Sequence, residues 1–318
     1  MYRVTRMVMA LVALTLSFAA AQHDHSAANE ATYAFDGEAL EGPESLPAGY
    51  HLVTLQNDGE SSVDIIVVRL LDGATTEDIV AHFQAIDEAF MGGDPVEAIN
   101  EALTVAELYG GPDTEGGERG SVGITLPEGR YAVVASYRAN GEEQADDAMI
   151  EEDTGDEDTG DEGEDEASED MGPPPPSSYA TIDLEVTSDD AAEAPEADVT
   201  VQMVEFAFTF PAAMPVGEQL WEVVNSGEQL HHLVLVRIRE GFTMDDVMAY
   251  AESFEGEDPT EQVGHVNILS PGISNFASFD LTPGTYLATC FLPDHGEDGD
   301  GRPHFLHGMM QTFTVDGD

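Results

Sequence analysis

The chain has 318 residues, of which 65 are acidic and only nine are basic, so its formal net charge at pH 7 is −56. So strong a negative charge repels nucleic acid and anionic membrane surfaces, and it excludes both as partners. The length allows two ordinary domains. The 31 glycines and 17 prolines between short apolar runs favour strands joined by turns over a helical bundle.

The first 21 residues have the layout of a secretory signal peptide. Two arginines lie in residues 1–6, an apolar run follows in residues 7–18, and alanines at positions 19–21 supply the small residues of a cleavage site. The apolar run is shorter than the roughly 20 residues that a membrane-spanning helix needs. We therefore expect an exported protein, periplasmic or secreted, with no membrane span.

Residues 47–78 and 215–246 form an internal repeat with a constant offset of 168 positions, and 11 of the 32 aligned positions are identical. Both segments predict a strand, a turn of the form Asn-x-Gly-Glu, a second strand and the start of a helix. A second match, at an offset of 155, relates residues 126–131 to residues 281–286. The chain is thus predicted to contain two copies of one β-domain, at residues 31–188 and 197–318.

An acidic insertion interrupts the first copy at residues 141–176. It holds 17 carboxylates and no basic residue between Glu142 and Asp170, and such a run of like charges is typical of a solvated, disordered segment. The remaining 48 of the 65 acidic residues are spread along the chain. Their spread favours adaptation to a salty medium, in which ions screen the self-repulsion, over docking to a basic redox partner.

Four residues of the second copy have side chains that bind soft metals. Cys290 lies at the end of an apolar strand, His231 stands where a turn enters a strand, and His304 and Met309 precede the last strand. Taken alone, a single thiol without a disulfide partner predicts a small buried hydrophobe. Two imidazoles, a thiolate and a thioether together, however, are the donor set of a type 1 copper site.

At these segments the sequence resembles the cupredoxin family, and the plastocyanin and pseudoazurin branch in particular. In that family the first histidine opens a strand after an Asn-containing turn, as His231 does after Asn225. The cysteine ends a strand that follows a Pro-Gly-x-Tyr turn, as Cys290 follows residues 283–286. The last two ligands have the spacing His-x4-Met with glycine before the methionine, and residues 304–309 match that pattern.

The resemblance implies one type 1 copper ion held by His231, Cys290, His304 and Met309. It implies an all-β fold of two tandem Greek-key cupredoxin-like β-sandwiches, each with a short helical insertion. It also implies single-electron transfer to a redox partner protein that the sequence does not identify. The electron is expected to leave through His304, because the second histidine of the family lies at the exposed end of the sandwich.

Thirteen residues separate Cys290 from His304, whereas family members usually have two to four. Residues 294–302 are expected to form a mobile polar loop. A fold tolerates such an insertion at small entropic cost, but the longer loop could open the site to water. His295, five residues after Cys290, is an alternative ligand. No methionine follows it at a matching distance, so His304 is preferred.

The other histidines and one methionine are assigned different places. Because successive residues of a strand face opposite ways, only one of His231 and His232 can enter the site, and the resemblance selects His231. The others are expected away from the ligands: His307 at the rim of the site, Met310 in the core or at a sheet edge, His265 in a solvated loop, and His23 and His25 in a flexible N-terminal tail.

The first copy lacks the chemistry of the second. Val63, Ala135 and, with a looser match, Ala180 stand at the positions of the first histidine, the cysteine and the methionine. We interpret this copy as a degenerate domain that packs against the second, binds a partner or extends the scaffold. Two-domain copper oxidases and nitrite reductases need further histidine clusters. Neither copy contains a His-x-His motif, so no enzyme is predicted.

Two other functions stay open at this point. The long loop and the additional histidines and methionines also fit a protein of copper storage, delivery or resistance. The chain could also be a metal-free interaction module, in which Cys290 is only a buried core residue and no metal site has been retained.

Overall fold

The computed structural model describes residues 29–138, 177–188, 192–211, 214–253 and 255–317. The predicted signal peptide (residues 1–21), His23, His25 and the acidic insertion (residues 141–176) lie outside the described residues. Within the described residues, no helix is both long and apolar enough to span a bilayer. The domain limits at residues 31–188 and 197–318 stay predictions.

The elements of the N-terminal sandwich surround one apolar core. In chain order they are β1 (Asn29–Phe35), β2 (Leu40–Glu41), β3 (Ser45–Pro47), β4 (Gly49–Asn57), β5 (Val63–Leu70), α2 (Thr76–Gly92), α3 (Pro95–Leu103), β6 (Ala106–Leu108), β7 (Asp113–Thr114), β8 (Arg119–Leu126), β9 (Gly129–Tyr137) and β10 (Ser178–Thr187).

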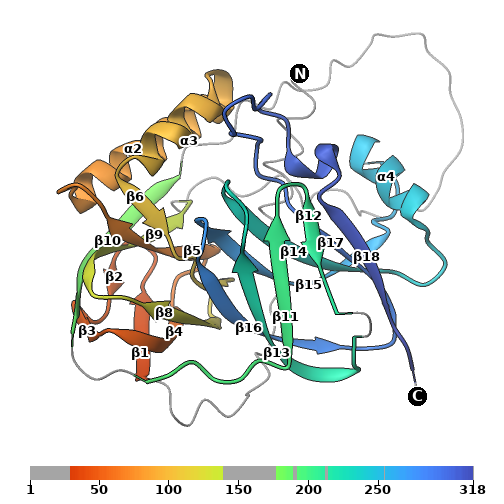
Figure 1. Cartoon of the computed structure of the whole chain (residues 1–318), viewed down its shortest axis with the longest axis horizontal. Coiled ribbons are helices and arrows are strands. Elements are labelled where there is room, and N and C mark those ends of the chain that lie inside the picture. The colour runs from red at the N-terminus through yellow and green to blue at the C-terminus, as the bar shows by residue number, and fades with distance from the viewer. Residues whose placement is uncertain (1–28, 139–176, 189–191, 212–213, 254, 318) are drawn as a thin grey trace, which may run out of the picture.

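The elements of the C-terminal sandwich surround a second core, which includes the cysteine. The predicted all-β class, with two tandem sandwiches and a helical insertion in each, is confirmed (Figure 1). The elements are β11 (Val199–Val204), β12 (Ala207–Thr209), β13 (Gly217–Asn225), β14 (His231–Ile238), α4 (Met244–Ser253), β15 (Thr260–Leu269), β16 (Ser274–Leu281), β17 (Gly284–Thr289), the 3-10 helix η1 (His304–His307) and β18 (Met310–Val315).

One sheet runs through both sandwiches. Its strand order is β12-β11-β13-β16-β8-β4-β1-β2, and the halves join where β16 pairs antiparallel with β8 at Asn275–Ile124 and Phe276–Gly123. Each sandwich closes with a sheet of its own, ordered β3-β10-β9-β5-β6 in the N-terminal half and β15-β14-β17-β18 in the C-terminal half. The sequence pattern did not predict the shared sheet, because strand pairing between segments so distant has no local signal.

The two halves pair equivalent strands in the same register. Ile66 of β5 lies opposite Val134 of β9, and Val234 of β14 lies opposite Thr289 of β17. These residues are related by the offsets of the sequence repeat, since 66 + 168 = 234 and 134 + 155 = 289. The pairs β1·β4 and β4·β8 correspond in the same way to β11·β13 and β13·β16. Equivalent sequence positions therefore lie at equivalent places in the two sandwiches.

The first helix of each half starts at the same local signal. The backbone N–H of Thr75 donates to the Asp78 carboxylate at 2.9 Å, and the Asp78 N–H donates back to the Thr75 hydroxyl at 3.2 Å. Thr243 and Asp246 form the same reciprocal pair before α4, at 2.7 and 3.4 Å. Because such a capping box satisfies two backbone N–H groups, it places the helix start locally, as the sequence predicts.

The helical insertion of the N-terminal half reaches the C-terminal half. The apolar residues of α2 and α3 pack on the sheet that contains β5 and β9, and this cluster extends to Leu230 and Leu292 of the C-terminal half. Nearby, Ser270 and Leu108 exchange two hydrogen bonds of 2.9 Å, one through the serine hydroxyl. Contacts between the halves therefore include residues next to the predicted metal ligands.

His265 does not lie in a solvated loop, and that expectation was wrong. It belongs to β15, where it pairs with Val234 of β14, and its Nε2 atom lies 3.2 Å from Oδ1 of Asp113 in the N-terminal half. The sequence around His265 is glycine-containing and polar, which favours a loop, but pairing with β14 overrides that local preference.

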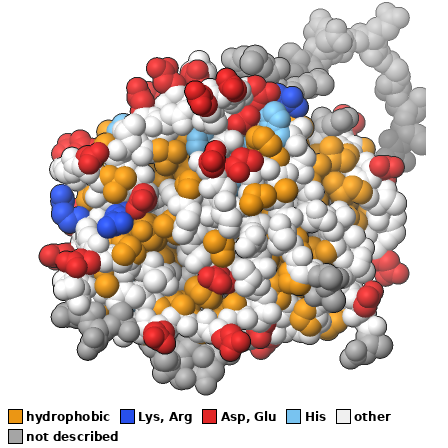
Figure 2. Space-filling model, viewed as in Figure 1, with side chains coloured by type: hydrophobic (Ala, Val, Ile, Leu, Met, Phe, Trp, Pro, Cys, Tyr) orange, Lys and Arg blue, Asp and Glu red, His pale blue; other side chains and the backbone are white. Residues whose placement is uncertain are grey.

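Acidic side chains are spread over the surface. In Figure 2 they lie along the top, both sides and the bottom of the visible face, and basic side chains appear in few places. Half-buried arginines pair with acids on the neighbouring strand, as Arg69 does with Glu107 at 3.4 Å and Arg237 with Glu261 at 3.6 Å. Such surface pairs are few beside the many acidic side chains, so most of the surface charge is balanced only by solvent ions.

Candidate metal centre

Three of the four predicted ligands lie together in the C-terminal sandwich. Nδ1 of His231 is 3.1 Å from Nδ1 of His304, and Sγ of Cys290 is 3.5 Å from the same His304 atom. One ligand atom from each residue lies within 4.8 Å of the other two. All three side chains are 0% exposed.

A rigid turn positions His231 as the first residue of β14. The side chain of Asn225 is buried inside this turn, where Nδ2 donates to the backbone oxygens of Gln229 and Leu269, both at 2.8 Å. Its Oδ1 atom accepts from the backbone N–H of Gly227 at 3.0 Å. Because these bonds tie both sides of the turn together, the chain enters β14 with His231 facing the core.

The long segment between Cys290 and His304 is closed at its base. The N–H of His304 donates to the Leu292 oxygen at 2.8 Å, and the N–H of Phe305 donates to the Cys290 oxygen at 2.9 Å. Pro293 and Pro303 then pair in an isolated β-bridge. The intervening residues therefore leave and return without separating the ligands. The longer loop does not open the site to water, since the Cys290 and His304 side chains are both wholly buried.

The separations fit one bound ion. Bonds of about 2.0 Å to imidazole nitrogen and about 2.3 Å to thiolate sulfur are typical of metal sites with these donors. Two ligand atoms that share one ion at such bond lengths lie no more than about 4 Å apart, and the observed separations of 3.1 and 3.5 Å are within that limit.

Burial keeps the imidazoles neutral. It lowers the pKa of His231 to about 4, although the nearby Glu205 carboxylate opposes the shift. Burial, together with the facing His231, lowers the pKa of His304 to about 3. Both rings therefore offer a free lone pair at neutral pH. Burial also raises the pKa of the Cys290 thiol to about 12, so the thiolate forms there only with a compensating positive charge.

Met309 is tied to two of these residues. It is 0% exposed and lies in the same core cluster as Cys290. Its backbone oxygen accepts from the Cys290 N–H at 3.3 Å, and its own N–H donates to the His304 oxygen at 3.0 Å. Gly308, with φ at +105°, provides the left-handed residue that turns the chain from η1 into this position.

The alternative ligand, His295, is occupied elsewhere. Its Nε2 atom accepts a hydrogen bond from the Leu230 N–H at 2.9 Å, and its Nδ1 atom lies 3.2 Å from Oδ1 of Asn100. With both ring nitrogens engaged, His295 has no free lone pair for an ion. The preference for His304 agrees with this geometry.

The structure contradicts the expected exposure of His304. Its side chain is 0% exposed, and Nε2 has no hydrogen-bond partner. The ring of Phe206 stands edge-on to it at 5.3 Å and lies beside the ring of His307 at 4.8 Å. The predicted rim position of His307 fits this arrangement. The rings of Phe206 and His307 therefore lie beside the buried His304 ring.

Sequence reasoning missed the residues that cover the site. Glu205 and Phe206 form the turn between β11 and β12, and the Glu205 carboxylate lies 3.7 Å from Nε2 of His231. Phe206 has φ at +59°, a left-handed conformation that a bulky residue rarely adopts. Neither the turn geometry nor its approach to the histidines has a motif that the sequence could reveal.

The neighbouring residues take supporting places. His232 lies next to the site, and its Nε2 atom accepts from the Phe291 N–H at 2.8 Å, beside Cys290. Met310 packs partly buried in a small cluster around Val247, as expected for a core or edge position. In the N-terminal sandwich, Val63 and Ala135 are buried in the core, so apolar side chains occupy the positions that carry ligands in the C-terminal half.

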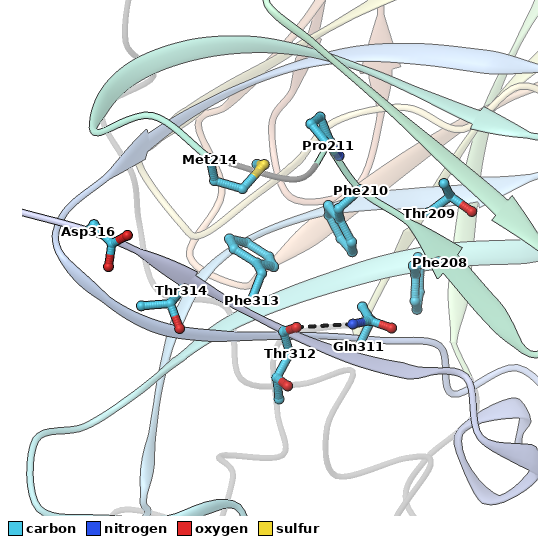
Figure 3. Close-up of a pocket in the computed structure, with 10 residues that line it drawn as sticks. All are labelled: Phe208, Thr209, Phe210, Pro211, Met214, Gln311, Thr312, Phe313, Thr314 and Asp316. Atoms are coloured by element: carbon cyan, nitrogen blue, oxygen red, sulfur yellow. Dashed lines mark hydrogen bonds between the residues drawn. The ribbon is translucent and has the colours of Figure 1, made fainter.

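An open groove, lined by both apolar and polar side chains, lies elsewhere on the C-terminal sandwich. Figure 3 shows Phe210 and Phe313 close together in its wall, with ring centroids 4.9 Å apart. Met214 and Phe208 also line it, and none of the four predicted ligands does. This groove is therefore separate from the candidate metal centre.

Comparison with known proteins gives no family assignment. No family model matches the chain, and no curated protein matches it. Among solved structures, reduced auracyanin from Roseiflexus castenholzii is similar at 23% identity, over 37% of this chain and 95% of that chain, with a TM-score of 0.27.

Two enzyme structures are similar over most of the chain. They are a copper-containing nitrite reductase from Thermus scotoductus (9% identity, 91% of this chain, 61% of that chain, TM-score 0.22) and a multicopper oxidase from Campylobacter jejuni (10%, 92%, 65%, TM-score 0.22). The chain thus spans less than two thirds of either enzyme. Because these neighbours are enzymes, the prediction that this chain is not an enzyme gains no support from them. At such low scores the neighbours do not assign an activity.

Proposed function

We propose that this chain binds one copper ion through His231, Cys290, His304 and Met309 and transfers single electrons. The observation that carries the proposal is the convergence of two imidazole nitrogens and a thiol sulfur at 3.1 and 3.5 Å, all wholly buried. A copper ion bound there would supply one-electron redox chemistry, since thiolate and thioether favour Cu(I) and imidazole suits Cu(II).

The cost of burying both imidazoles favours a metal site over a purely structural cluster. Their Nδ1 atoms face each other at 3.1 Å, and on the far side of the His304 ring Nε2 is buried without a hydrogen-bond partner. Burying a polar group in this way costs roughly 1–3 kcal/mol for each group, so a fold under no other demand favours apolar residues here. The N-terminal sandwich has an apolar residue, Val63, at the position of His231.

The enclosure of the site defines what the surrounding residues do. The Asn225 turn and the closed base of the 290–304 segment hold the ligands before any ion arrives, which limits the reorganisation that a change of charge would demand. Glu205 faces His231 and balances positive charge at the centre. The rings of Phe206 and His307 provide the path between His304 and the surface.

Location and the role of the N-terminal half complete the proposal. We propose an exported protein, because residues 1–21 have the layout of a signal peptide, and a degenerate N-terminal copy that holds no metal. The redox partner is a protein that the sequence does not identify. Storage or delivery of copper is the alternative that the experiment below separates from electron transfer.

Copper titration of the purified protein tests the proposal. We expect one equivalent of copper per chain and an intense visible thiolate-to-Cu(II) band. Tight but colourless binding of Cu(I), with no such band after oxidation, would indicate storage or delivery instead. Absence of stoichiometric binding in both redox states would leave the metal-free interaction module. His82→Ala, which changes a histidine on α2, is a matched control and should leave the titration unchanged.

A further inference from the structure

The segment between Cys290 and His304 touches the N-terminal sandwich, where it runs close to α3 (Figure 1). The contact centres on His295, whose side chain is only 6% exposed. Nδ2 of Asn100 on α3 donates to the His295 backbone oxygen at 3.1 Å, and Oδ1 of Asn100 lies 3.2 Å from Nδ1 of His295. One side chain thus binds both the backbone and the ring of His295.

The hydrogen bonds assign the tautomer of this ring. The backbone N–H of Leu230 can only donate, so Nε2 of His295 is the acceptor in the 2.9 Å bond between them. The ring proton is therefore on Nδ1, from which it is donated to Oδ1 of Asn100. The Asn100 amide thus accepts from the His295 ring through Oδ1 and donates to the His295 backbone oxygen through Nδ2. Neither a charged nor an apolar side chain can make both of these hydrogen bonds.

This contact links the two segments that carry the histidine ligands. His295 accepts from Leu230, which directly precedes His231, and the backbone N–H of His295 donates to Oε1 of Gln229 at 2.7 Å. His295 itself belongs to the segment that ends at His304. A displacement of His295 would therefore disturb both sides of the metal centre.

Apolar packing brings α3 to the same place. Ile99 of α3 belongs to one cluster with Leu230 and Leu292, which flank His231 and Cys290 in the sequence. A Cβ atom at Gly301 would lie only 3.2 Å from Cγ2 of Val96, so the outgoing and returning arms of the segment both pass close to this helix. The hydrogen bonds of Asn100 are thus part of a larger contact between α3 and the C-terminal half, which also includes apolar packing.

We propose that Asn100 is a positioning residue for the metal centre: from the N-terminal sandwich it clamps His295 and so holds the segments of His231 and His304 at ligand distance. The proposal rests on the proposed copper site. A segment of thirteen residues pays more closure entropy than a short one and needs contacts beyond its own ends to be ordered. The ligand-free sandwich supplies such a contact.

Asn100→Leu in the full chain tests the clamp, because leucine is of similar size and removes both hydrogen bonds. In the metal-free protein we expect backbone amide hydrogen exchange to rise about tenfold at Leu230 and in residues 291–303. In the copper-loaded protein we expect the thiolate-to-Cu(II) band to shift and broaden, and copper to be released faster. Asn100 is exposed, so the variant should fold, which circular dichroism checks.

Three further variants separate a clamp from a general loosening. His295→Gln can keep an acceptor for Leu230 but loses the ring bond to Asn100, so it should behave like Asn100→Leu. Asn100→Gln retains an amide with a longer reach and should restore part of the protection and of the band shape. Glu101→Ala, an exposed change on the same helix, should alter neither readout.

Two results would overturn the proposal. Unchanged exchange in Asn100→Leu would show that the contact does not order the segment. Raised exchange with an unchanged band and unchanged copper release would show that it orders the segment without positioning the ligands. If the parent protein binds no copper, the proposed function fails separately. The exchange experiment needs no metal and then decides the clamp alone: a rise supports it, and no rise contradicts it.

Discussion

The N-terminal and C-terminal sandwiches share one arrangement of strands but have different side chains in the region of the candidate metal centre. Their strands pair in the same register, and the same side chains close the same corners. Tyr131 donates its hydroxyl to the backbone oxygen of Pro127 at 2.7 Å, and Tyr286 donates to that of Thr282 at 2.8 Å. The scaffold therefore depends on turns, corners and apolar alternation, which are present in both halves.

The halves differ where the ligands lie. The C-terminal half buries His231 and Cys290 at positions where the N-terminal half buries Val63 and Ala135. The equivalent strands pair in the same register whether these positions hold apolar residues or the proposed ligands. The fold therefore tolerates the ligand residues without needing them. The difference indicates that the candidate metal centre is an addition to the sandwich and that substitution of its proposed ligands should affect copper binding far more than folding.

The largest effect on copper binding is expected when Cys290 is replaced by alanine, the residue at the equivalent position of the N-terminal half. Cys290→Ala should abolish the thiolate-to-Cu(II) band. It should also weaken copper binding by more than the roughly 10–100-fold that is lost when a residue hydrogen-bonded to a metal ligand is removed. The free energy of unfolding of the metal-free protein should change by only about 1 kcal/mol, since the side chain is small. Absorption spectra and urea denaturation check both statements.

The converse change sharpens the same comparison. Ala135→Cys places a thiol at the equivalent position of the N-terminal half, where no histidine accompanies it. It should create no visible copper band. A new band from this variant would contradict the view that the site needs the whole set of ligands.

A smaller effect is expected at the cover of the site. Phe206→Leu removes the aromatic ring that stands edge-on to His304 and, if that ring carries the electron as proposed, should slow electron exchange with small redox reagents several-fold, while one equivalent of copper still binds. Stopped-flow kinetics measures the exchange. Phe291→Leu, which changes an aromatic ring next to Cys290, provides the comparison. Equal slowing in both variants would contradict a path through Phe206.

The pH dependence of stability should differ between the halves at one shared position. Asp64 stands where the C-terminal half has His232, and burial, followed by the nearby Asp113, raises the pKa of Asp64 from 3.8 to about 7. Between these values the folded state holds a proton that the unfolded chain has lost. The free energy of unfolding should therefore fall as pH rises from about 4 to about 7, by at most about 1.4 kcal/mol per pH unit.

Asp64→Asn isolates this contribution from the general repulsion of so acidic a chain. Urea denaturation of the parent and the variant should give curves whose difference changes across that window and is constant above it. A difference that does not depend on pH would show that Asp64 is ionised throughout.

The smallest and most symmetric effect is expected at the helix caps. Thr75→Ala and Thr243→Ala each remove one capping hydroxyl and should each lower the free energy of unfolding by about 1 kcal/mol. Neither should alter copper binding, because both caps belong to the shared scaffold. Thermal and urea denaturation of the two variants measure the change. A clearly unequal effect would break the equivalence of the halves.

Local signals explain what could be predicted from the sequence. The Asn225 turn, the Pro-Gly-x-Tyr turn and the His-x4-Met spacing each lie within a few residues, so backbone preferences alone indicate where strands begin and where His231, Cys290 and the 304–309 segment lie. The constant offset of the repeat predicted two sandwiches for the same reason, because a repeated pattern of turns and apolar residues repeats the local structure.

Only the tertiary structure decided how distant segments meet. The burial of His304, the placement of His265 in β15, the engagement of His295 by Asn100 and the sheet shared by β8 and β16 all depend on contacts between residues far apart in the chain. Such contacts depend on packing and hydrogen bonding in three dimensions, for which the sequence carries no local pattern. The sequence by itself determined the donor set, and the tertiary structure determined that this set is enclosed and that the other half contacts the segment between Cys290 and His304.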